Sequence, residues 1–189
     1  MSQLSAAPSV TYWVLRDSIK NGDIVHIHRP KSGFNFKTLV YSVIQFFTGS
    51  PIYHNVVAIW MTAPGEQQKL MAIESNIHGG KRMIEMSMYS ANLLELQPLP
   101  SQFEFAKMEE TLLSHLGQQP YGLRDFISIG LLEFFGVKAK NHKGQVCSEL
   151  CADAWIQAGV PLRSTLISPG KLKSELIKLG VPVTLNTNV

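Results

Sequence analysis

The chain has little charge, few cysteines and no long uninterrupted apolar run. Only 16% of its 189 residues are charged, the net charge is +3, and lysine and arginine are scattered along the chain. This pattern lacks the basic cluster that nucleic-acid binding requires, so we expect no nucleic-acid partner. The apolar fraction of 45% is ordinary for a globular protein, which argues against a disordered chain.

The sequence also has no secretory signal and no segment of membrane-spanning length. Residues 1–10 are small and polar, without a basic start or a continuous apolar core. The longest apolar-rich stretch, 34–47, is interrupted by polar residues and predicts an amphipathic helix. We therefore expect no transmembrane segment, with peripheral membrane contact left open. No repeat or linker divides the chain, which predicts one domain over residues 1–189.

Cys147 and Cys151 are the two cysteines of the chain, and they lie four residues apart. This spacing of one helical turn disfavours a disulfide between them, and free thiols suit a reducing compartment, so we expect a cytoplasmic protein. Around them runs a pattern typical of one buried helix face. Its apolar or small residues are Cys147, Leu150, Cys151, Ala154, Trp155 and Ala158, and Gly159 ends the pattern.

Cys147 therefore lies at the predicted start of a helix, directly after a loop that contains Gly144. The unpaired N–H groups and the positive end of the helix dipole stabilise a thiolate there, and a thiolate is the nucleophilic form of cysteine. Cys147 is thus the candidate nucleophile, beside the alternative that it only fills the core. Cys151 lies one turn further along, where this field has decayed, and is predicted to be a core residue.

Predicted strands dominate the first half of the chain and predicted helices the second half. The expected strands are 24–28, 54–61, 69–75 and 82–86, after a short helix at 12–20. From residue 101 onward we expect helices at 103–116, 123–135 and 171–179 besides the cysteine helix, and a last strand at 182–185. This grouping is typical of an α+β fold with an antiparallel sheet.

A cysteine nucleophile needs a general base and a third polar group that orients the base. His54 is the candidate base because it begins a predicted strand directly after a turn, beside the alternative of a solvated strand-end histidine. If the hairpin turns symmetrically around residue 64 or 65, His54 faces Glu74 or Asn76, and either choice puts all three side chains on one sheet face. Glu74 is the preferred orienting residue, since a carboxylate stabilises a protonated imidazole, and Asn76 is the alternative.

His26 and His28 share one face of a predicted strand, at a spacing of two residues. Two imidazoles without a carboxylate or thiol at a matching spacing are a weak metal signal, so we interpret both as structural or cleft-lining. A zinc site formed by His26, His28 and Cys147 is the competing hypothesis, and it predicts stoichiometric zinc in the purified protein.

Several segments resemble the circularly permuted papain-like cysteine hydrolases of the NlpC superfamily, in particular the YiiX-like branch related to lecithin retinol acyltransferase. The order of histidine, acidic residue and cysteine is distinctive, because ordinary papain-like enzymes place the cysteine first. The segments span most of the chain, from about residue 22 to residue 179. They are Gly22-Asp23-Ile24-Val25, Thr48-Gly49-Ser50-Pro51-Ile52-Tyr53-His54-Asn55-Val56-Val57, Ile73-Glu74-Ser75, Val146-Cys147-Ser148-Glu149-Leu150 and Ser168-Pro169-Gly170-Lys171-Leu172.

The resemblance implies a circularly permuted papain-like fold of the NlpC type, in which a small antiparallel sheet carries His54 and Glu74 and packs against the helix of Cys147. It implies acyl transfer through a thioester, without a cofactor or metal, on a small-molecule, peptide or acyl-chain substrate such as an N-acyl amino acid or a lipid ester. The expected activity is that of a hydrolase or an acyltransferase. The alternative is a catalytically weak module that keeps the fold and binds a fatty acid or an acylated small molecule.

Three residues are candidates for substrate binding or for the oxyanion site: Asn76, and two tyrosines, Tyr53 beside the histidine and Tyr121 in the second half of the chain. A phenol can donate a hydrogen bond to a developing oxyanion, and the alternative for each tyrosine is buried aromatic packing. The basic loop at 138–143 and the helix at 34–47 vary within this superfamily, so they are expected to shape the substrate cleft.

Overall fold

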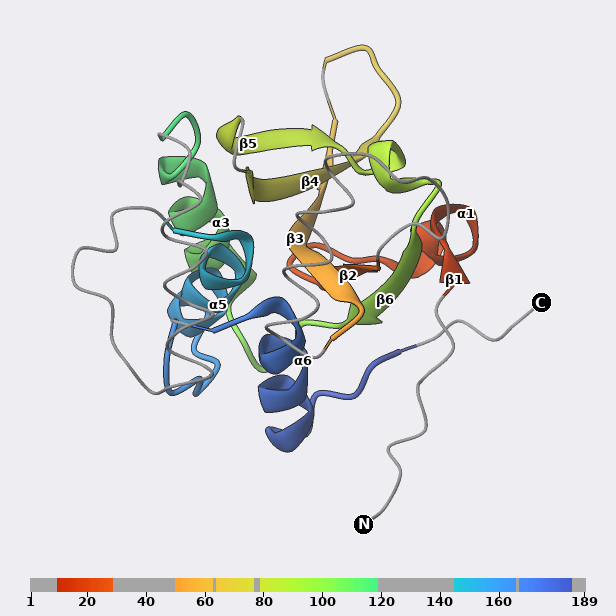
Figure 1. Ribbon diagram of the computed structural model, residues 1–189. Helices are drawn as coiled ribbons and strands as arrows, with labels where there is room; N and C mark the ends of the chain where they lie inside the picture. Colours follow the sequence, from red (N-terminus) through yellow and green to blue (C-terminus); the bar gives the residue numbers. More distant parts are fainter. Residues whose placement is uncertain are drawn as a thin grey trace.

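A six-stranded antiparallel sheet lies at the centre of the computed structural model, in the order β1-β6-β2-β3-β4-β5 (Figure 1). The structure describes residues 10–28, 50–62, 64–76, 79–118, 145–165 and 167–184. The strands are β1 (Val10–Thr11), β2 (Ile24–His28), β3 (Ile52–Met61), β4 (Lys69–Asn76), β5 (Gly80–Glu85) and β6 (Leu93–Gln97). The helices are α1 (Tyr12–Leu15), α3 (Phe105–Ser114), α5 (Cys147–Gln157) and α6 (Pro169–Lys178), with 3-10 turns η1 (Arg16–Ser18) and η2 (Met86–Tyr89).

The predicted α+β class with an antiparallel sheet is confirmed, and β2 has the predicted bounds. The helix predicted at 12–20 ends sooner, because α1 passes into η1 after Leu15. The strand predicted at 82–86 covers 80–85, since Met86 begins η2. Of the last predicted strand, the described residues 182–184 form one isolated bridge, between Thr184 and Leu96. The helices predicted at 34–47 and 123–135 lie outside the described residues.

Sequence reasoning missed β1 and β6, which add two strands beyond β2. The signal for β6 was present, because Leu94 and Leu96 alternate with Glu95 and Gln97. The two leucines are buried in one core and the two polar residues lie on the opposite face. This period of two is the pattern of a half-buried strand.

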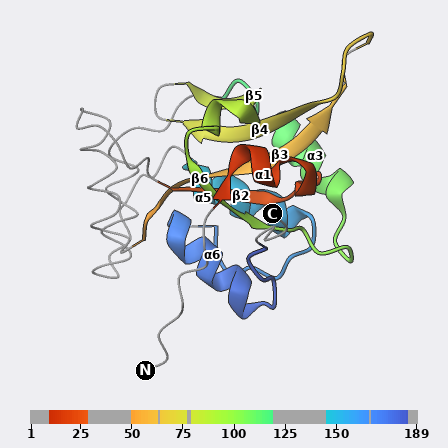
Figure 2. The same ribbon diagram turned by 90° about the vertical axis from the view of Figure 1, so that its right-hand side faces the viewer.

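The two faces of the sheet bury separate cores. On one face Val57, Ile59 and Ile73 pack against α3, α5 and α6, with the fully buried Trp155 of α5 among them. On the other face Val56, Ala58 and Ala72 pack with Tyr12 and Leu15 of α1. Figure 2 shows α1 lying in front of the sheet. The alternation follows from the strand geometry, in which successive side chains point to opposite faces.

The hairpin of β3 and β4 is symmetric around residue 65, one of the two predicted registers. Val57 faces Ile73 and Ala58 faces Ala72, so paired residue numbers sum to 130. The paired register ends at Val57 and Ile73. Beyond that point β3 pairs with β2 alone, and β4 pairs with β5 alone. The two strands therefore separate at the end that carries His54 and Glu74.

The start of α5 lies at this separation. Ser75 Oγ donates a hydrogen bond of 2.6 Å to the carbonyl oxygen of Gln145, two residues before the helix begins. The backbone N–H of Val146 donates to the Glu149 carboxylate at 2.9 Å, which fixes the first turn of α5. The helix begins at Cys147, as its apolar pattern predicts.

No helix within the described part of the chain has both the length and the apolar character needed to cross a membrane.

Candidate active site

Cys147 and His54 meet where β3 and β4 separate. The Cys147 side chain lies close enough to the His54 ring for its negative charge and its hydrogen bonding to raise the pKa of that ring. His54 Nε2 bonds the Glu74 carboxylate instead, so Nδ1 is the ring nitrogen that remains for the sulfur. The candidate nucleophile, base and orienting carboxylate are therefore consecutive members of one chain of contacts.

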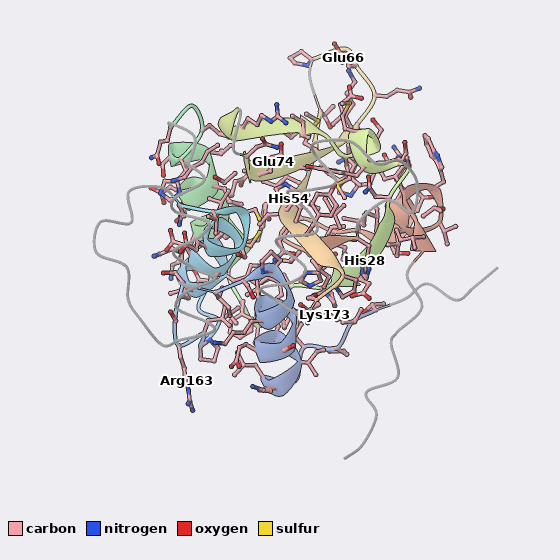
Figure 3. All side chains as sticks on the ribbon, viewed as in Figure 1. His28, His54, Glu66, Glu74, Arg163 and Lys173 are labelled. Carbon is pink, nitrogen blue, oxygen red and sulfur yellow. The ribbon has the colours of Figure 1, made fainter. Side chains whose placement is uncertain are left out.

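Glu74 forms a hydrogen bond with His54, and the distance from His54 Nε2 to Glu74 Oε2 is 2.5 Å. Figure 3 shows the two residues side by side. Continuing the hairpin register would place Asn76 directly opposite His54, yet the longer Glu74 side chain reaches the histidine along the diagonal. Asn76 instead ends β4 opposite Gly80 of β5.

The Glu74 side chain is completely buried, and donors from three elements bind its carboxylate. His54 of β3 and the Tyr89 hydroxyl of η2 both donate to Oε2. Arg82 of β5 donates from Nε to Oε1 at 2.7 Å. Burial raises the pKa of Glu74, but the hydrogen bonds and charge of its partners outweigh burial and lower that pKa to about 2. Glu74 is thus a carboxylate at neutral pH.

His54 is 6% exposed, and its pKa is shifted upward against the effect of burial. Burial lowers the pKa of His54, but the negative charge and hydrogen bond of Cys147, together with Glu74, raise it from 6.5 to about 10. The imidazolium is therefore the favoured form of this ring when the sulfur carries a negative charge. This is the electrostatic arrangement of a cysteine nucleophile paired with a histidine.

Tyr53 lies against the candidate base. Its ring stacks on the His54 ring with a centroid distance of 6.0 Å and an interplanar angle of 20°. The contact between neighbouring residues arises at a β-bulge, since Ile27 pairs with His54 but His28 pairs with Ile52. Tyr121, the other predicted tyrosine, lies outside the described residues.

Cys151 is a core residue, as its position one turn into the helix predicts. It is fully buried, and burial followed by the nearby Cys147 raises the pKa of its thiol well above the ordinary value. Both cysteines are free. The two thiols on one helix thus have different surroundings, and Cys147 is the one in contact with a base.

Sequence reasoning missed Tyr89 and Arg82, which both bind Glu74. The signal for Arg82 was its position, because a hairpin symmetric around residue 78 pairs Glu74 with Arg82, as observed. No sequence signal pointed to Tyr89, which lies in the 3-10 turn after β5.

His26 belongs to a second buried polar network on the helix-covered side of the sheet. Its ring nitrogens lie 2.9 Å from Asn55 Oδ1 and 2.6 Å from Gln97 Oε1. Gln97 Nε2 in turn donates to the carbonyls of Lys173 and Val181, each at 3.2 Å. Burial lowers the pKa of His26. His26 thus anchors α6 to the sheet, which confirms its structural interpretation.

His28 and Glu95 continue this network toward the surface. The distance from His28 Nε2 to Glu95 Oε1 is 3.1 Å, and Lys173 of α6 binds the same carboxylate. Figure 3 shows His28 and Lys173 on the side of α6, away from Glu74. Within the described ranges, no three histidine, cysteine, aspartate or glutamate side chains converge as metal ligands would.

No known protein-family model matches the chain, and no curated protein matches it. The chemistry of the site must therefore be inferred from its geometry.

The buried ion pair of His54 and Glu74 makes the free energy of unfolding depend on pH. Glu74 has a lowered pKa, so its contribution is present above about pH 4.5 and is lost as pH falls toward 2. His54 has a raised pKa, so its contribution is present below about pH 6.5 and is lost as pH rises toward 10. We expect Glu74→Gln to lower the free energy of unfolding by about 3 kcal/mol between pH 4.5 and 6.5, and by progressively less toward pH 2 or 10.

Urea denaturation at several pH values measures this difference. The matched control is Glu66→Gln, since Glu66 forms an ion pair with Lys69 in which both side chains are 53% exposed. This control should change stability little at any pH, because exposed ion pairs contribute little. An equal loss at pH 2.5 and pH 5.5 for Glu74→Gln would contradict the coupling.

Proposed function

We propose that this protein is a cysteine hydrolase or acyltransferase that acts on an amide or ester bond through Cys147, His54 and Glu74. The contact of His54 with Cys147 on one side and with Glu74 on the other carries the proposal. A nucleophile, a base and a group that orients the base form the constellation of covalent acyl transfer. The fold proposed for it is the permuted papain-like fold, which the antiparallel sheet and the helix beginning at Cys147 support.

In the proposed reaction the Cys147 sulfur attacks the carbonyl carbon while His54 holds the proton. A tetrahedral intermediate forms, and the backbone N–H of Cys147 at the start of α5 donates to its oxyanion. His54 then gives its proton to the leaving amine or alcohol, and a thioester to Cys147 remains. Water, or another acceptor, loses a proton to His54 and attacks the thioester, which releases the acyl group and restores the thiol.

Glu74 fixes the proton position during these steps. Its carboxylate accepts the Nε2–H of His54, which leaves Nδ1 to exchange the proton with the sulfur. The charge of Glu74 also stabilises the imidazolium that forms when His54 takes the proton. This division of roles needs no group beyond the three side chains and the helix start. The proposed substrates are peptides, N-acyl amino acids or lipid-type esters, and the two free cysteines support a reducing cytoplasm as the proposed location.

The proposal predicts that iodoacetamide modifies Cys147 selectively at pH 6. An ordinary thiol is more than about 99% protonated at this pH, so only a cysteine paired with an imidazolium should react quickly. Cys147 has 2% of its surface exposed and Cys151 has none, which favours the same site. We expect modification of Cys147 about 100-fold faster than that of Cys151, measured by mass spectrometry of proteolytic peptides.

Cys151→Ala is the matched control and should keep the rate and the pH profile of Cys147 modification. A profile that rises only above pH 8 would instead describe an ordinary thiol and favour the catalytically weak binding module. An unresponsive Cys147 at every pH would also overturn the enzymatic proposal.

A further inference from the structure

We infer that Tyr89 is a positioning residue for the proposed reaction and that it acts by holding the Glu74 carboxylate against His54. The inference rests on the proposed function, because it concerns how the orienting carboxylate is kept in place. Tyr89 lies in η2, outside the strands that carry His54 and Glu74. Nothing in its local sequence marks it as part of a site.

The main observation is that Tyr89 and His54 share one oxygen atom. Both donate to Glu74 Oε2, and the centroids of their rings lie 5.9 Å apart. Tyr89 also interacts electrostatically with Cys147 and Tyr53, so its hydroxyl lies among the groups of the site. The hydrogen bond from Tyr89 to Glu74 Oε2 fixes the orientation of the carboxylate relative to the imidazole.

The Tyr89 hydroxyl remains a donor at all relevant pH values. Burial raises its pKa, and the negative charge of Glu74 and the hydrogen bond to it raise it further. Tyr89 therefore always presents a proton to the carboxylate and does not compete with His54 for the catalytic proton. This separates its role from that of a general acid or base.

Arg82 alone is not suited to hold the carboxylate toward His54. It binds the other oxygen, Oε1, and its own side chain is 44% exposed. A glutamate side chain has three rotatable bonds, and without Tyr89 the contact with His54 itself would be the remaining hydrogen bond to Oε2. With Tyr89 in place, Oε1 is bound from β5, and Oε2 has a second donor from η2 besides His54.

The test is a titration of the His54 ring by NMR in Cys147→Ala protein, in which the thiol no longer influences the ring. Tyr89→Phe keeps the aromatic ring and removes only the hydroxyl. We expect the pKa of His54 to fall by about 1, because a carboxylate without this donor makes a weaker hydrogen bond and charge interaction with the imidazolium. The matched control is Tyr12→Phe, which removes a hydroxyl from a buried tyrosine of the same core and should leave the His54 titration unchanged.

A double-mutant cycle shows whether Tyr89 acts through Glu74. If it does, Tyr89→Phe should change the pKa of His54 by less than about 0.3 in protein that already carries Glu74→Gln. The same decrease with and without Glu74 would overturn the inference, as would an unchanged or raised pKa of His54 in the Tyr89→Phe variant. Circular dichroism and thermal melting confirm that each variant compared is folded.

Alkylation of Cys147 separates this inference from the proposed function. In protein that retains the thiol, Tyr89→Phe should lower the rate of iodoacetamide modification at pH 6 by about fivefold to tenfold. Slow modification of the unmutated protein at pH 6 would refute the proposed function itself. Rapid modification that Tyr89→Phe leaves unchanged would refute only the positioning role of Tyr89.

Discussion

Replacing His54 with alanine is expected to lower the rate of Cys147 modification by iodoacetamide at pH 6 by about 100-fold. The imidazolium is the positive charge in contact with the sulfur, and the raised pKa of His54 keeps that charge in place through neutral pH. Without it, no positive charge in contact with the sulfur stabilises a thiolate, which is the form that reacts with iodoacetamide. The rate should recover above pH 9, where an ordinary thiol ionises unaided. Mass spectrometry of the modified peptide over a pH series measures both effects.

The matched control for this substitution is His115→Gln. His115 is a partly buried histidine near Lys81 and Asp153, and it lies in the turn that follows α3. Its replacement removes an imidazole from the same protein without touching the chain of contacts from Cys147 to Glu74. If His54→Ala and His115→Gln gave the same profile as the unmutated protein, the pairing of His54 with Cys147 would be refuted.

The candidate triad could be predicted because each member depends on a local pattern or on one hairpin. The helix start at Cys147 follows from a glycine loop and an apolar period of 3.6 residues. Side chains alternate between the two faces of a strand, so either turn centre of the hairpin puts His54 and Glu74 on the same face of the sheet. The contact between them follows from this shared face. Such short-range rules determine which side chains share a face, although they do not determine which of Glu74 and Asn76 makes the bond.

The surroundings of the triad could not be predicted in the same way. Tyr89 reaches Glu74 only because η2 folds back over the end of β4. The network of His26 joins β2, β3, β6 and α6. These elements are too far apart in the sequence for a local pattern to predict their contacts. Contacts of this kind depend on the order of strands in the sheet, and two of those strands, β1 and β6, were not predicted.

The separation of β3 and β4 explains how residues from the two faces of the sheet come into contact at one site. His54 and Glu74 lie on the face of Val56 and Ala72, whereas α5 packs on the opposite face. A continuous ladder would keep Cys147 away from His54. Because pairing between the two strands stops at Val57, the first residue of α5 contacts His54 at the gap. The position of α5 therefore controls the geometry of the whole triad.

Trp155 of α5 is the largest fully buried side chain of the described residues, so Trp155→Ala is expected to have the largest effect on stability. Its side chain is fully buried, and Nε1 donates to the carbonyl oxygen of Gly22 at 2.9 Å. Gly22 has a φ of +90°, and a Cβ there would lie 2.5 Å from Met108 Cε, so this turn accepts no larger residue without a shift. We expect a loss of about 4 kcal/mol in the free energy of unfolding, from the cavity and the lost hydrogen bond.

A loss of this size should lower the melting temperature by about 8–16 °C, which calorimetry or circular dichroism measures. Trp13→Ala is the matched control, because Trp13 is 68% exposed and should change the melting temperature by less than about 2 °C. Trp155→Phe keeps part of the packing, so its change in melting temperature should lie between those of Trp155→Ala and Trp13→Ala. A small effect of Trp155→Ala would show that α5 is held by other contacts. A large effect together with slower modification of Cys147 in the folded fraction would link the packing of this helix to the chemistry at its first residue.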